Sequence, residues 1–220
     1  MIPNLIDYFE NIRAIVENNK DVRPVDYEHF VVAGCSHSVG VGVEQHQRYS
    51  SILQQQIGIP ARNISVPGGC ATVASVYLTR WLSTVGRPRF AVVQWPNVMR
   101  WPAWYNESMY IENANDHRTV FPALVRAGET NFWAEWLRSV LTTNILYQTA
   151  GIPIINIYLD SIPRDYRDLM LTNNITVYDN IDNAVWSLDS KGSDGKHHSA
   201  ECHAQWASKI LEIINETTTR

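Results

Sequence analysis

Residues 29–40 read HFVVAGCSHSVG, and this stretch decides the fold. Residues 29–33 form a short apolar run that ends at Gly34. An apolar run of this length, closed by a turn residue, is typical of a strand in a buried parallel sheet. Glycines and polar residues follow, so we expect the chain to turn at the end of the strand and to display the hydroxyl of Ser36 there.

The same pattern, an apolar run closed by a turn residue, recurs along the chain and predicts an α/β fold. Apolar runs closed by Gly, Pro or Asn predict four further strands, at residues 63–66, 89–94, 152–159 and 175–178. Helical spacing of apolar residues predicts helices at residues 4–16, 49–57, 71–82, 132–149 and 199–214. Strands that alternate with helices indicate a parallel five-stranded sheet covered on both faces. We interpret residues 1–220 as a single domain with an aromatic-rich insert at about 98–130.

Composition and charge exclude several classes of function. The 220 residues carry a net charge of -4, and their basic residues are scattered, which argues against a nucleic-acid partner. No apolar run is long enough to cross a membrane, and the first residues lack the apolar core of a signal peptide, so we expect a cytoplasmic or virion-associated protein without membrane insertion. Three cysteines without a CxxC pair predict neither a disulfide framework nor a structural zinc site.

A segment near the C-terminus supplies the groups that a serine nucleophile needs. A serine hydroxyl attacks when a base takes its proton. Asp194 stands three residues before His197, so its carboxylate can turn back to the imidazole across one loop and fix the tautomer of the ring. We therefore predict Ser36 as nucleophile, His197 as base and Asp194 as acid. In the alternative interpretation, Ser36 caps a helix, and Asp194 and His197 are ordinary loop residues.

Two other strand ends offer donors for the negative oxygen that forms during the attack. Gly68 follows the second predicted strand, and its bare backbone can bring an N–H close to a substrate. Asn97 follows the third, and its side-chain amide is a neutral donor. Together with the N–H of Ser36, these groups make a predicted oxyanion hole of three donors.

Four segments, in order, resemble the blocks of the SGNH hydrolase (GDSL esterase) superfamily. GCSHSVG at 34–40 resembles the nucleophile block, and NISVPGGC at 63–70 resembles the glycine block. VVQWPN at 92–97 is similar to the block that ends in asparagine, and DGKHHSAECHAQWASKIL at 194–211 is similar to the block with the catalytic acid and base. The chain departs from the family pattern at Cys35, Pro96, Val98 and His198, which stand where Asp, Gly, Asp and Pro are usual.

The resemblance implies a three-layer α/β/α flavodoxin-like sandwich that hydrolyses esters without a metal or an organic cofactor. We expect a serine esterase that acts on short acyl esters, with O-acetylated carbohydrate as the preferred substrate class. Lipid or thioester hydrolysis, acyl transfer to an acceptor other than water, and a catalytically decayed binding module of the same fold are the alternatives. A further alternative makes the thiol of Cys35 the nucleophile.

The aromatic insert and its neighbours supply candidate substrate contacts. Flat aromatic faces can stack on sugar rings or acyl chains, and a guanidinium can contact a polar or acidic group. On this basis we predict that substrate is contacted by His37, Trp95, Arg100, Trp101 and Trp104. The alternative for the aromatic residues is packing of the core and of a lid, and for His37 a structural role next to the nucleophile.

Overall fold

The computed structural model describes residues 28–98, 100–105, 108–113, 129–158, 162–176 and 190–218. In this part of the chain, β1 (Phe30–Ala33), β2 (Ala61–Asn63), β3 (Ala91–Trp95) and β6 (Ile154–Tyr158) form one parallel sheet in the order β2-β1-β3-β6. In chain order this is 2-1-3-4, which matches the beginning of the flavodoxin-like order. Val32 lies opposite Val92, which in turn lies opposite Ile155.

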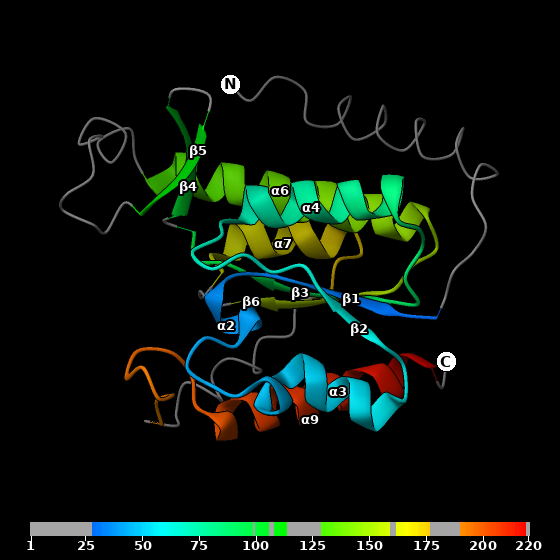
Figure 1. Cartoon of the computed structure of the whole chain (residues 1–220). Helices are drawn as coiled ribbons and strands as arrows, with labels where there is room; N and C mark the ends of the chain where they lie inside the picture. The colour runs from blue at the N-terminus through cyan, green and yellow to red at the C-terminus, as the bar shows by residue number, and fades with distance from the viewer. Residues whose placement is uncertain are drawn as a thin grey trace.

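Helices cover both faces of this sheet and make a three-layer sandwich, as expected (Figure 1). One face carries α4 (Ala71–Thr84), α6 (Glu129–Thr149) and α7 (Arg164–Thr172), and the other carries α3 (Tyr49–Ile57) and α9 (Ala200–Thr218). Side chains alternate along β1, so Val31 and Ala33 pack under α4 and α6, whereas Phe30 and Val32 pack against α3 and α9. The carboxyl ends of the strands therefore emerge between two helical layers, where α/β proteins place their sites.

The parallel sheet of the described residues has four strands, so the prediction of five is wrong for this part of the chain. Ile175 and Thr176 belong to no strand, and residues 177 and 178 lie outside the described residues. The Ile175 N–H donates to the Met170 carbonyl at the end of α7, and its side chain is 1 % exposed in the core. Ile175 therefore closes the end of α7, although its residue type also suits a short strand.

The second strand lies two residues earlier than predicted. β2 covers Ala61–Asn63, whereas the sequence predicts the strand at residues 63–66. The chain still runs beside β1 there, because the N–H groups of Ile64 and Val66 donate to the carbonyls of Val32 and Gly34. This continued pairing holds the glycine turn that follows β2 next to the end of β1.

The described part of the insert is a two-stranded antiparallel hairpin. Its strands are β4 (Arg100–Tyr105) and β5 (Ser108–Asn113), with Arg100 opposite Asn113. Residues 101–129 show no regular spacing of apolar residues, so these strands were not predicted, and neither was α7. The helix predicted at residues 4–16 lies outside the described residues. Within the described ranges, no helix is long and apolar enough to cross a membrane.

Candidate active site

Ser36 opens a one-turn helix directly after β1. This helix, α2 (Ser36–Val39), follows Cys35 and ends at Gly40, whose φ of 78° is left-handed. The Gly40 N–H returns to the carbonyls of Ser36 and His37, so the turn closes tightly. A left-handed residue is needed at that point, and glycine adopts it without steric cost. The result is a serine at the carboxyl end of a central strand, with 6 % of its surface exposed.

The structure brings Ser36, His197 and Asp194 into one hydrogen-bonded line. His197 Nε2 lies 2.9 Å from Ser36 Oγ, and His197 Nδ1 lies 2.5 Å from Asp194 Oδ2. Asp194 Oδ1 also accepts the backbone N–H groups of Lys196 and His197, each at 3.0 Å. The acid therefore holds both the loop and the ring, and it leaves Nε2 facing the serine hydroxyl.

The loop of residues 190–198 is fastened to the loop that follows α2. The Ser193 N–H and hydroxyl both donate to the Gly42 carbonyl, at 2.8 and 3.0 Å. A side chain on Gly192 would stand 2.7 Å from that carbonyl, so only glycine permits this approach. These contacts hold together segments about 150 residues apart in the sequence and thereby keep His197 beside Ser36.

Hydrogen bonds and burial set the charges at this site. Three N–H groups donate to the Asp194 carboxylate and hold its pKa well below the usual range, so it stays ionised. Burial lowers the pKa of His37 to about 3 and that of His198 to about 4, and neighbouring positive charges add to both shifts. Both of these imidazoles are therefore neutral near pH 7, whereas the acid beside His197 is negative.

A cluster of rings that was not predicted lies beside His197. The His37 ring lies 5.1 Å from the His197 ring and 4.5 Å from the His198 ring, centroid to centroid. The His198 ring meets Trp206 of α9 at 5.0 Å, and His203 meets the same indole at 5.7 Å. His198 and His203 are both buried, and their rings pack against the indole. The spacing of residues 199, 203 and 206, which puts them on one face of a helix, was the sequence pattern that could have predicted this packing.

A buried network of polar side chains, also not predicted, holds α2, the short helix that begins with Ser36. The Tyr49 hydroxyl donates to Ser38 Oγ at 2.8 Å, and Ser38 Oγ donates to Gln94 Oε1 at 2.7 Å. Asn63 Nδ2 donates to the Ser38 carbonyl at 2.7 Å. In the sequence, the only indication of this hydrogen-bonded network is Gln94, a polar residue inside the apolar run of β3. Cys35 contacts the same glutamine, with its Sγ 3.6 Å from Oε1.

The thiols of all three cysteines are buried. Cys35 is completely buried, Cys70 is 1 % exposed and Cys202 is completely buried. Burial raises the pKa of Cys70, which keeps it protonated. The placement of Cys35 gives its sulfur no surface from which to attack, so it argues against a thiol nucleophile.

Gly68 lies in a tight turn beside the nucleophile loop. Residues 66–69 form a turn in which the Gly69 N–H donates to the Val66 carbonyl at 2.8 Å and Gly68 has a φ of 72°. Proline followed by a left-handed glycine is the type II pattern. A side chain on Gly69 would lie 3.3 Å from the Gly34 carbonyl, which shows how closely this turn approaches the end of β1.

Asn97 and Arg100 lie at the next strand end. Asn97 is half-buried in the turn after β3, and its carbonyl accepts the Arg100 N–H at 3.1 Å. Arg100 Nη1 donates to the Gly69 carbonyl at 3.3 Å. The turn that holds Asn97 and the turn that holds Gly68 are thus tied together by this one arginine.

The other residues predicted to contact substrate lie in different environments. Trp95 is completely buried, and its Nε1 donates to Asn156 Oδ1 at 2.8 Å, so it packs the core and presents no surface to a substrate. Trp95 was predicted to contact substrate, but the alternation along β3 places its side chain in the core cluster that also holds Val93 and Trp136. His37 is half-buried between His197 and His198. The side chains of Trp101 and Trp104 lie outside the described residues.

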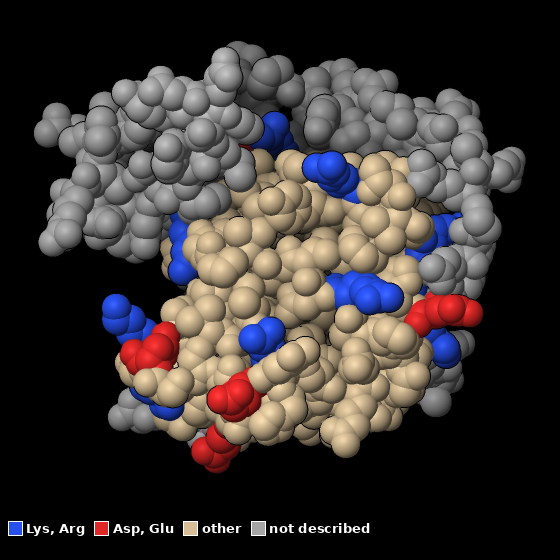
Figure 2. All heavy atoms as spheres, viewed as in Figure 1, with Lys and Arg blue, Asp and Glu red and all other residues tan. Residues whose placement is uncertain are grey.

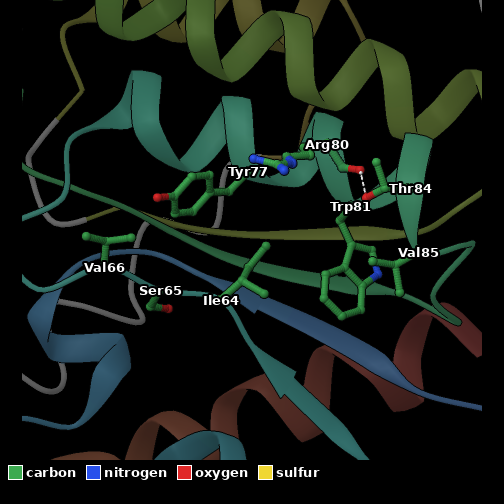
Figure 3. A pocket seen from close by; sticks show the side chains of 8 residues that line it. All are labelled: Ile64, Ser65, Val66, Tyr77, Arg80, Trp81, Thr84 and Val85. Carbon is green, nitrogen blue, oxygen red and sulfur yellow. Dashed lines mark hydrogen bonds between the residues drawn. The ribbon is translucent and has the colours of Figure 1, made fainter. Parts of the chain in front are cut away.

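A groove of about 350 Å³ lies elsewhere, between α4 and the segment that follows β2 (Figure 3). Tyr77, Arg80 and Trp81 line one side, and Ile64, Ser65 and Val66 line the other. It contains none of the predicted site residues. On the face seen in Figure 2, the Lys and Arg side chains of the described surface are separated by uncharged groups and form no continuous patch. The described residues contain no group of three or more His, Cys, Asp or Glu placed to hold a metal ion.

Comparison with known proteins adds to this geometry. No protein-family model matches the chain, and no curated protein matches it. Among solved structures, a psychrotrophic esterase, EstA, from Pseudoalteromonas sp. matches with a TM-score of 0.59 at 13 % identity, over 88 % of this chain and 100 % of that one. A lipolytic protein of the G-D-S-L family from Veillonella parvula matches with a TM-score of 0.51 at 12 % identity, over 85 % and 98 %.

The chain has the SGNH/GDSL hydrolase fold. An acetyl xylan esterase, Est2A, from the rumen bacterium Butyrivibrio proteoclasticus also has it, with a TM-score of 0.53 at 11 % identity, over 90 % of this chain and 66 % of that one. At such identities the likeness concerns the fold alone. Within the SGNH/GDSL fold, the aligned Ser36, His197 and Asp194 side chains are this chain's own evidence for chemistry.

Proposed function

We propose that the protein is a serine esterase that uses Ser36, His197 and Asp194 for acyl transfer to water. The observation that carries the proposal is the line of contacts from Asp194 Oδ2 to His197 Nδ1, at 2.5 Å, and from His197 Nε2 to Ser36 Oγ, at 2.9 Å. These are the distances at which a base takes a proton from a hydroxyl and an acid fixes the tautomer of that base.

In the first half of the reaction, Ser36 Oγ attacks the ester carbonyl while its proton passes to His197 Nε2. The imidazolium is stabilised by the ionised Asp194. The tetrahedral intermediate collapses, the bond to the alcohol oxygen breaks, and His197 returns the proton to the departing alcohol. In the second half, water attacks the acyl group on Ser36, and His197 first takes and then returns a proton. The carboxylic acid leaves, and the enzyme is regenerated.

Three donors would hold the negative oxygen of each intermediate. The Ser36 N–H is the first in α2, where backbone N–H groups have no acceptor within the helix. The N–H of Gly68 lies in a turn whose hydrogen bond uses the N–H of Gly69. The amide of Asn97 completes the proposed set. Removing one such donor typically slows turnover by about 10²–10³-fold.

O-acetylated carbohydrate is the substrate class that we favour. One protein of the same fold is an acetyl xylan esterase, which supports an acetyl ester of a sugar as the substrate. The aromatic residues of the insert add flat faces of the kind that stack on sugar rings. Water is the proposed acceptor of the acyl group.

The test is hydrolysis of 4-nitrophenyl acetate, butyrate and octanoate by the wild type, Ser36→Ala and His197→Ala. We expect activity that falls as the acyl chain lengthens and that is lost in both variants. His46→Ala is the matched control, because His46 is an exposed histidine outside the site. Activity that survives in Ser36→Ala would overturn the proposal, and a binding module without catalysis would show no activity in the wild type.

A further inference from the structure

Arg100 occupies a special position between the two proposed oxyanion turns. Its backbone N–H donates to the Asn97 carbonyl at 3.1 Å, and its Nη1 donates to the Gly69 carbonyl at 3.3 Å. Gly69 in turn approaches the Gly34 carbonyl, two residues before Ser36. The guanidinium is therefore anchored at the point where the three strand ends meet.

The charge of this guanidinium has no carboxylate to balance it among the described residues. None of the ion pairs within the described ranges includes Arg100, and Asp194 is occupied by its three N–H donors. Arg100 is only half-buried. Its guanidinium has five N–H donors, and one of them donates to the Gly69 carbonyl. Its positive charge also reaches the site, where it contributes to the low pKa of His37. A partly desolvated cation of this kind gains most from an anion that arrives with the substrate.

We infer that Arg100 binds a carboxylate on the alcohol part of the substrate, so that the esters hydrolysed are acetyl esters of acidic sugars such as uronic acids. This inference rests on the proposed esterase function and narrows its substrate class. A guanidinium and a carboxylate form two parallel hydrogen bonds, which orient as well as bind. The carboxylate would set the position of the sugar, and thereby the position of the neighbouring acetyl group over Ser36.

The specificity test uses two substrates that differ in one group. Methyl O-acetyl-glucuronoside carries a carboxylate at the carbon where methyl O-acetyl-glucoside carries a hydroxymethyl group. We expect the wild type to favour the glucuronoside in kcat/KM, and Arg100→Gln to lower the ratio of the two kcat/KM values by about 10- to 100-fold, the usual range for a hydrogen-bonded charge pair. Arg100→Lys should fall between, because it keeps the charge and loses the planar fork.

Arg80→Gln is the matched control, because it removes the same charge from an exposed position on α4 and should leave the ratio unchanged. A second measurement separates this inference from the esterase proposal: calorimetric binding of the unacetylated methyl glucuronoside and glucoside to Ser36→Ala with and without Arg100→Gln. Tighter binding of the glucuronoside that requires Arg100 supports the carboxylate site, even if no ester is hydrolysed. Equal binding of the two sugars, or an unchanged ratio in Arg100→Gln, overturns it, even if Ser36 proves to be the nucleophile.

Discussion

Asp194→Asn should leave the loop of residues 190–198 folded and yet greatly reduce kcat. In the structure, one carboxylate oxygen accepts the backbone N–H groups of Lys196 and His197, and the other faces His197 Nδ1 at 2.5 Å. An asparagine keeps one oxygen, which can still accept both backbone bonds. Its amide nitrogen then faces Nδ1 and donates to it. That donation favours the imidazole with its proton on Nε2, which cannot accept the proton of Ser36.

The expected loss is about 10³–10⁴-fold in kcat, or about 4–5.5 kcal/mol of transition-state stabilisation. KM should change little, because Asp194 lies behind the imidazole and away from the serine. The assay is steady-state hydrolysis of 4-nitrophenyl acetate, with thermal unfolding measured on the same samples. Asp165→Asn serves as the control, since it makes the same change at an exposed position in the first turn of α7. A correctly folded Asp194→Asn that keeps more than about a tenth of the wild-type kcat would refute the reasoning, because the acid would then only cap its loop.

The remaining predictions concern backbone strain, pH and thiol reactivity. Gly68→Ala and Gly58→Ala each put a side chain in open space at a left-handed φ, of 72° and 73° respectively, so each should lower the free energy of unfolding by about 1–2 kcal/mol. Only Gly68→Ala should also reduce kcat. Equal kcat in the two variants would contradict the oxyanion role of Gly68. The half-buried His37 and the buried His198 and His203 have pKa values lowered to about 3–4, below the unfolded value of about 6.5. The stability that they contribute is therefore complete above pH 6.5 and is lost as the pH falls toward 4. Urea unfolding at pH 7, 5.5 and 4.5 checks this, and a constant free energy would argue against neutral buried rings. A disulfide reagent should react slowly with the native protein and reach three thiols after denaturation, because the thiols of all three cysteines are buried.

Local patterns were sufficient for the strand–turn–helix elements that carry the site. The apolar run before Gly34 is β1, and the helix predicted at residues 49–57 has those bounds in the structure. Both features depend on neighbours within one element: side-chain periodicity and a glycine that stops it. The order of the blocks also placed Ser36, Asp194 and His197 in loops that the fold brings together.

The misses have a common physical cause, which is that burial depends on partners far away in the sequence. Ile175 has the residue type of a strand, but it closes the end of α7. Trp95 sits next to the site in sequence, yet its side chain points into the core toward Asn156. The contact of Ser38 with Gln94 spans 56 residues, and no local pattern encodes it. His198 stands beside the predicted base, but only the packing of α9 shows that it rests on Trp206.

The most direct test of the proposed triad is covalent labelling of the wild type with a fluorophosphonate, followed by intact mass and peptide mapping. An activated serine attacks the phosphorus, so we expect one label per chain, located on Ser36. The label should be absent in Ser36→Ala and strongly slowed in His197→Ala, while His46→Ala labels as the wild type does. No label on the folded wild type, or a label on another residue, would contradict the claim that Ser36, His197 and Asp194 act as a catalytic triad.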